Sequence, residues 1–155
     1  MQIALDTAVS RATRDIVSSA LSWRVTNGRH VTRPVNSSTA EANAIIGIVG
    51  AVEGTVMLKC SRRIAVEVTR AMLGLDASGE SAEVRDALGE LLNMVVGKAK
   101  AYYAEDHDAF SFTVPTTAMG DNYQVYLRAR AGATVTAIHF LCPFGPFSVE
   151  VHVKR

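Results

Sequence analysis

Apolar side chains recur at helical intervals in three segments of the chain. In residues 3–21 they return every three or four positions and polar side chains fill the gaps, which predicts an amphipathic helix. Residues 61–74 repeat this pattern between a serine that can cap the first turn and a glycine that can end the last one. A third helix is predicted over residues 82–103, with Ser81 as its cap.

The other apolar segments have the composition of β-strands. Residues 44–60 contain two β-branched runs separated by a turn around Glu53 and Gly54, which predicts an antiparallel hairpin. Within the first run, Gly47 and Gly50 indicate a bulge or a close approach of another backbone. In the last third of the chain, regularly spaced turn residues predict an antiparallel meander of four runs. These runs are residues 109–118, 123–131, 134–142 and 147–155.

The segment between the first helix and the hairpin carries several turn signals. Asn27 and Gly28 form a pair that is typical of turns. Pro34 interrupts the strand-like residues that follow, which predicts a short edge strand, and residues 36–41 are expected to form a loop. All these elements together predict an α+β fold in one domain over residues 1–155, with two or three helices packed on a mostly antiparallel sheet.

Composition and charge narrow the classes of partner. Hydrophobic residues make up 48% of the chain and charged residues 20%, as in ordinary folded proteins, and the net charge is +1. A charge so close to zero, with both signs mixed along the chain, favours neither a nucleic acid nor a membrane surface as partner. No apolar run is long enough to cross a bilayer, and the N-terminus lacks the features of a signal peptide, so the cytoplasm is the expected location.

The sequence predicts no metal site. Cys60 and Cys142 have neither a metal-ligand spacing nor the pattern of a disulfide framework. Each lies in an apolar, strand-like context and is expected to be a buried thiol. The Glu-Asp-His-Asp run at residues 105–108 has no matched partner elsewhere in the sequence, so a solvated turn is the expected structure there.

The predicted third helix carries a polar stripe. At about 100° per residue, four positions fall within roughly 60° of one another: Asp86, Glu90, Asn93 and Gly97. Apolar residues occupy the opposite side, so the stripe faces outward, to water or to another macromolecule. A merely solvated helix face is one explanation. Against it, asparagine is a mediocre helix former, and each interior glycine costs about 1 kcal/mol relative to alanine.

The glycines and the amide are features of a docking surface. Gly97 lies one turn beyond Asn93, where a missing side chain opens space, and Gly89 falls to one side, where it would allow close packing against the sheet. No nucleophile–histidine arrangement, metal spacing or phosphate loop is recognisable. An acid and an amide could instead complete an active site that a partner supplies. The amide can hold a water in line with a phosphorus atom, and the carboxylate can pair with a partner's lysine.

The pattern Asp-x-x-x-Glu-x-x-Asn at residues 86–93, with Gly97 following, resembles the signature of the CheC/CheX/FliY phosphatases of bacterial chemotaxis. The CheX branch is the most similar. The glycine-punctuated hairpin at residues 45–60, the helix that ends in AMLG, the later FSFTVPTTAMG and the closing GPFSVEVHV also fit CheX-like chains. The resemblance covers residues 40–153, and it implies a CheX-like fold.

The resemblance also implies a substrate and a role for the stripe. The substrate is the phosphorylated aspartate of a CheY-like receiver domain, which brings its own Mg²⁺ and a lysine, so no cofactor is expected on this chain. Glu90 corresponds to the docking acid and Asn93 to the amide that orients the attacking water. Asp86 and Gly97 are expected to border the partner. The single copy of the motif favours a CheX-like homodimer, in which two chains commonly pair through their sheets.

Two other classes of function stay open. Related folds serve as flagellar-switch components that bind signalling proteins without hydrolysis, so the chain could be a non-catalytic adaptor or scaffold for receiver or switch proteins. The intact pair of Glu90 and Asn93 favours the phosphatase, because a pure adaptor would not need it. A small-molecule-binding α+β module would require a lined pocket, which a sequence cannot reveal.

Overall fold

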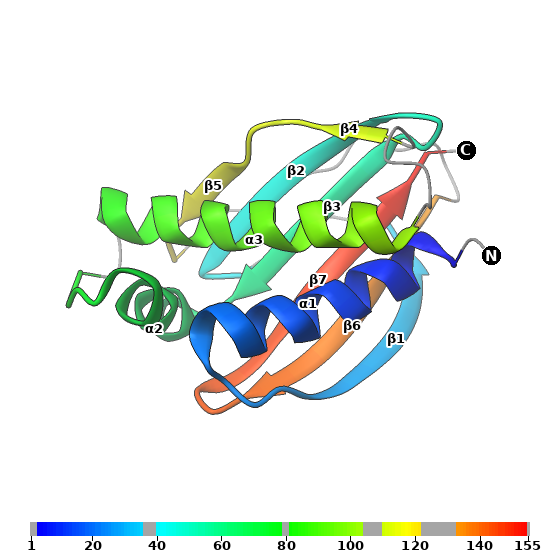
Figure 1. Ribbon diagram of the computed structural model, residues 1–155. Coiled ribbons are helices and arrows are strands. Elements are labelled where there is room, and N and C mark those ends of the chain that lie inside the picture. Colours follow the sequence, from blue (N-terminus) through cyan, green and yellow to red (C-terminus); the bar gives the residue numbers. More distant parts are fainter. Residues whose placement is uncertain (1–2, 36–39, 79–80, 104–109, 122–132, 155) are drawn as a thin grey trace.

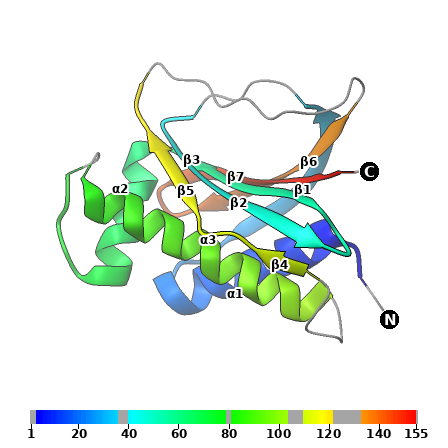
Figure 2. The same ribbon diagram turned by 90° about the horizontal axis from the view of Figure 1, so that it is seen from above.

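Three helices lie on one face of an antiparallel sheet in the computed structural model (Figure 1). The structure describes residues 3–35, 40–78, 81–103, 110–121 and 133–154. The helices are α1 (Leu5–Leu21), α2 (Arg62–Leu73) and α3 (Ala82–Tyr103). Helix α3 packs against both of the others, and Figure 2 shows all three gathered on one side of the strands. The α+β architecture predicted from the sequence is confirmed.

Seven strands of the described chain form one sheet. They are β1 (Thr26–Pro34), β2 (Ala42–Gly50), β3 (Gly54–Cys60), β4 (Phe110–Phe112), β5 (Thr116–Met119), β6 (Thr134–Cys142) and β7 (Gly145–Val153). Their order is β1-β6-β7-β3-β2-β4, and β5 pairs with β2 beside β4. Every pair of neighbours is antiparallel.

Side-chain caps fix where α2 and α3 begin. The Ser61 hydroxyl accepts a hydrogen bond of 3.1 Å from the backbone N–H of Ile64, and Gly74 ends α2 in the left-handed region, at φ 67°. The Ser81 hydroxyl accepts a longer bond, of 3.4 Å, from the backbone N–H of Val84. Both predicted caps are confirmed, and α3 has the bounds that the hydrophobic pattern predicted.

The core lies between the helices and the sheet. The predicted apolar side of α3 is buried in full, at Val84, Leu88, Leu91, Leu92, Val95 and Ala99. It meets alternate residues of the central strands, among them Ile46 and Ile48 of β2 and Val56 of β3. Because the opposite side of α3 is polar, burying these residues fixes the rotation of the helix and keeps its polar stripe outside.

The meander predicted for the last third of the chain is wrong. Strands β6 and β7 form a hairpin, but β4 and β5 both pair with β2, on the far side of β3. The expected single strand at residues 109–118 is broken into β4 and β5, with Thr113, Val114 and Pro115 between them. The run at residues 123–131 lies outside the described residues. Local spacing failed here because the partner of each strand is set by long-range contacts.

The Asn27–Gly28 pair, which is typical of turns, does not form a turn. Both residues lie within β1, where the pairing with β6 shifts between Asn27 and Arg29. Gly28 has φ 92° and provides the left-handed backbone that this bulge needs. Strand β1 is an edge strand, as predicted, but it is nine residues long and ends at Pro34. Most of the predicted loop at residues 36–41 lies outside the described residues.

Gly47 marks both a close approach of backbone and an irregularity in pairing, because the register of β2 shifts by one residue between Ile48, which pairs with Phe112, and Ile45, which pairs with Thr116. The β2–β3 register runs without a shift from the pair of Ala42 and Cys60 to the pair of Ile48 and Gly54. On the other side of β2, the chain after β4 comes close enough for two hydrogen bonds between Gly47 and Thr113. Gly47 thus lies at the point where the β4–β5 segment is attached to the sheet.

Both cysteines are buried free thiols, as predicted. Burial raises the pKa of Cys60 to about 12, with smaller contributions from the charges of Cys142 and Glu41. In the described part of the chain, the helices are too short or too polar to cross a membrane.

Candidate functional site

The polar stripe of α3 lies at the surface. We call the four residues Asp86, Glu90, Asn93 and Gly97 the acid–amide stripe. Asp86 and Glu90 are exposed, whereas Asn93 and Gly97 are half-buried. Successive residues of an α-helix rise by about 1.5 Å, so Glu90 and Asn93 stand about 4.5 Å apart along the axis and point to the same side. The stripe therefore presents a carboxylate and an amide together to any partner that approaches α3.

The polar groups of the stripe are available to a partner. Within the described part of the chain, Asp86 and Glu90 form no ion pair, and the Asn93 side chain makes no hydrogen bond. Charged residues elsewhere on the surface do pair, as Arg70 does with Glu67 and Asp76, at 2.8 Å each. A carboxylate and an amide without intramolecular partners can offer all of their hydrogen-bonding capacity to another molecule.

The two glycines of α3 have different surroundings. A β-carbon at position 89 would lie 3.3 Å from Pro115 Cγ and 3.4 Å from Thr117 Cγ2, so the missing side chain lets the β4–β5 segment approach the helix. A β-carbon at position 97 would meet only Phe112 Cζ, at an ordinary 3.8 Å. The close packing predicted for Gly89 is confirmed, and its neighbour is the β4–β5 segment at the edge of the sheet. Position 97 has room for a small side chain beside the stripe, with the Phe112 ring as its neighbour.

The connection between β4 and β5 borders the stripe. It consists of Thr113, Val114 and Pro115, and both figures show this segment running along α3. The sequence reading treated it as the interior of one strand and missed its place beside the site. The available signal was Pro115, since proline is rare inside a paired strand and marks edges and breaks.

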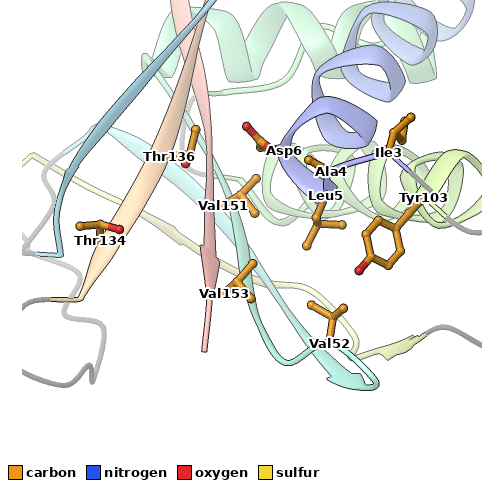
Figure 3. A pocket seen from close by; sticks show the side chains of 10 residues that line it. All are labelled: Ile3, Ala4, Leu5, Asp6, Val52, Tyr103, Thr134, Thr136, Val151 and Val153. Atoms are coloured by element: carbon orange, nitrogen blue, oxygen red, sulfur yellow. The ribbon is translucent and has the colours of Figure 1, made fainter. Parts of the chain in front are cut away.

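A separate cavity of about 580 Å³ opens where α1 begins and α3 ends (Figure 3). Leu5 and Val153 line it with apolar groups, while Asp6 and Tyr103 bring polar ones. No residue of the acid–amide stripe lines this cavity. Asp6 is also engaged with His30, whose Nδ1 lies 3.0 Å from Asp6 Oδ2. The lined pocket that a small-molecule-binding module would require is therefore present, but Glu90 and Asn93 do not line it.

The described residues contain no cluster of three or more side chains that could hold a metal ion. The acidic and histidine run at residues 105–108 lies outside the described residues, so its predicted solvated turn stays a prediction. The stripe has one carboxylate per helical turn, at Asp86 and Glu90, and no histidine or thiol beside them. Its donor set fits hydrogen bonding to a partner better than metal coordination.

Comparison with known families identifies the class of protein. The fold and the acid–amide stripe define a small α+β protein with a carboxylate and an amide together on the outer side of one helix. Residues 42–140, which include all of α3, match the family described as chemotaxis phosphatase CheX. The chain belongs to the CheX family. The resemblance read from the sequence is confirmed.

Solved structures of similar proteins share the fold over almost the whole chain. The chemotaxis protein CheX from Desulfovibrio desulfuricans is 26% identical, with a TM-score of 0.86 over 98% of this chain and 100% of that one. CheX from Vibrio vulnificus is 22% identical, with a TM-score of 0.81 over 95% and 97%. The CheX of a CheX–CheY–BeF₃–Mg²⁺ complex from Borrelia burgdorferi is 17% identical, with a TM-score of 0.75 over 99% and 100%. No curated protein matched the sequence.

Proposed function

We propose that this chain hydrolyses the aspartyl phosphate of a CheY-like receiver domain. The observation that carries the proposal is the pair of exposed Glu90 and half-buried Asn93 on α3 of a CheX family member, whose side chains have no ion-pair or hydrogen-bond partner among the described residues. The complex of a Borrelia burgdorferi relative with CheY supports the choice of partner. The receiver brings the acyl phosphate, its Mg²⁺ and a lysine, and this chain brings side chains that position the reactants.

Asn93 is the catalytic residue in this proposal. Its amide has both donor and acceptor atoms, so it can hold a water molecule in line with the phosphorus–oxygen bond that breaks. The water oxygen bonds to phosphorus, the electron pair of the broken bond leaves with the aspartate carboxylate, and the water proton leaves with inorganic phosphate or solvent. Acyl phosphates are already reactive, so orientation alone can supply much of the acceleration.

Glu90 fixes the register of docking. One turn from Asn93, its carboxylate pairs with the receiver's lysine, and this ion pair sets how far the amide reaches into the receiver. Removing it should weaken affinity more than it slows the hydrolysis step. Asp86 and Gly97 border the same contact, and because Gly97 has no side chain the receiver's backbone can come close to α3 there.

The test is the decay of a phosphorylated receiver. Receivers phosphorylated with a small-molecule phosphodonor are mixed with the purified chain, and the release of inorganic phosphate is followed. We expect the decay of at least one receiver to accelerate in proportion to the chain's concentration. Binding of phosphorylated receivers without any acceleration would contradict hydrolysis and would favour the adaptor instead. The homodimer expected from the resemblance stays a prediction, which sedimentation equilibrium tests.

A further inference from the structure

Val114 is a large apolar side chain held out into water. It is 85% exposed, the highest value among the large hydrophobic residues that the structure describes. Single exposed apolar residues are common on protein surfaces and need no function. Two further observations set Val114 apart. It lies at the level of Asn93 along α3, and hydrogen bonds hold the backbone on both sides of it.

The place of Val114 follows from the two glycines of α3. Pro115 packs at Gly89 and Phe112 packs at Gly97, so the β4–β5 connection runs antiparallel to α3. The eight steps from Gly89 to Gly97 span about 12 Å of helix, and the three steps from 112 to 115 span about 10 Å of extended chain. Asn93 is midway between the glycines, and Val114 is near the middle of the connection. The two residues therefore lie at the same level along α3.

The backbone around Val114 is fixed on both sides. Thr113 donates its N–H to the Gly47 carbonyl and accepts from the Gly47 N–H through its hydroxyl, both at 2.9 Å. Strands β4 and β5 each pair with β2, next to this connection. Thr113 is thus turned toward β2. The pairing with β2 shifts by one residue across the connection, which therefore holds one residue more than the stretch of β2 opposite it, and Val114 is the residue of the connection that stands out into solvent. Pairing on both sides thus holds the backbone that carries the exposed Val114.

We propose that Val114 is a docking residue for the receiver domain. It contacts an apolar part of the receiver surface beside the phosphorylated aspartate, while the acid–amide stripe engages the charged part. This inference rests on the proposed function, and continuity with the stripe is what identifies the occupant. Val114 does not touch the reacting atoms, so it acts on affinity and on the choice of receiver, and not on the hydrolysis step.

The test compares Val114→Asp with Val49→Asp in the dephosphorylation assay. Val49 is a second exposed valine, at 56%, which pairs with Ser111 of β4. Its neighbour Ile48 is buried under the helices, so Val49 faces the other side of the sheet. Both substitutions place a charge on an exposed side chain, and thermal unfolding checks that both variants fold. Burial of a valine in the complex is worth about a tenfold change in KM.

We expect Val114→Asp to raise KM for the phosphorylated receiver about tenfold and to leave kcat within twofold, whereas Val49→Asp changes neither. Val114→Ile should keep the wild-type KM. An active wild-type chain with an unchanged KM in Val114→Asp would overturn this inference alone, as would equal effects at both valines or a loss confined to kcat. A wild-type chain that accelerates no receiver would overturn the proposed function as well.

Discussion

Gly89 of α3 lies directly against Pro115 of the β4–β5 connection. A β-carbon at position 89 would be 3.3 Å from Pro115 Cγ, which is tighter than ordinary van der Waals contact, and the proline ring has little freedom to move away. This contact sets the distance between the helix that carries Asn93 and the segment that carries Val114. A helix accepts glycine here because the neighbouring segment occupies the space.

The two glycines of α3 should respond differently to alanine. Gly97→Ala gains helix propensity, up to about 1 kcal/mol, and its new β-carbon meets only Phe112 at 3.8 Å, so the free energy of unfolding should rise. In Gly89→Ala the same gain is offset by displacement of Pro115, so no stabilisation is expected. Urea denaturation measures both values. An equal rise in the two variants would contradict the tight packing at Gly89.

The cap of α2 gives a second prediction. Ser61→Ala removes the hydroxyl that accepts from the Ile64 N–H at 3.1 Å and should lower the free energy of unfolding by about 1 kcal/mol. Ser81→Ala, where the bond to Val84 is 3.4 Å long, is the matched control and should cost less. Denaturant midpoints at constant m-value compare the two. A larger loss at Ser81 would show that the bond lengths do not rank these caps.

Cys60 should be inert toward thiol reagents in the folded protein. Its pKa, raised to about 12 by burial from an ordinary value of 9.0, lowers the thiolate fraction at pH 8 by roughly a thousandfold. Since the thiolate is disfavoured only in the folded state, unfolding releases a proton above pH 9, and this group's contribution to stability falls between pH 9 and about 12.

A chromogenic disulfide reagent measures this reactivity. At pH 8 the native protein should react slowly, and denaturant should release two thiols, from Cys60 and Cys142. A thiol that reacts in the native protein at the rate of a free cysteine would contradict the burial.

The helices could be predicted from the sequence because their signals are local. The apolar spacing predicted the rotation of α3, and with it the position of Glu90 and Asn93 on its outer side. The sheet order could not be predicted, because whether β4 neighbours β2 or β6 depends on contacts between distant residues. For the same reason the role of Gly28 could not be predicted. It belongs to a pair typical of turns but lies at a bulge within β1.

The border of the site could be predicted only in part, since Pro115 signals a break in the strand but not where the segment lies. Val114 carries no signal of its own, since a valine before a proline fits an edge strand equally well. The position of Val114 relative to Asn93 follows only from the structure, where Pro115 contacts Gly89 and Phe112 contacts Gly97. These two contacts place Val114 level with Asn93 along the axis of α3, although the two residues are about twenty positions apart in the sequence.

The most direct test of the account is the rate of receiver dephosphorylation at saturating concentrations of Asn93→Ala. The amide is proposed to steer the attacking water, so this rate should fall about a hundredfold toward that of the receiver alone, while the affinity for the receiver changes little. Glu83→Ala, an exposed acid in the first turn of α3 outside the stripe, is the control and should keep the full rate. An undiminished rate in Asn93→Ala would contradict the mechanism.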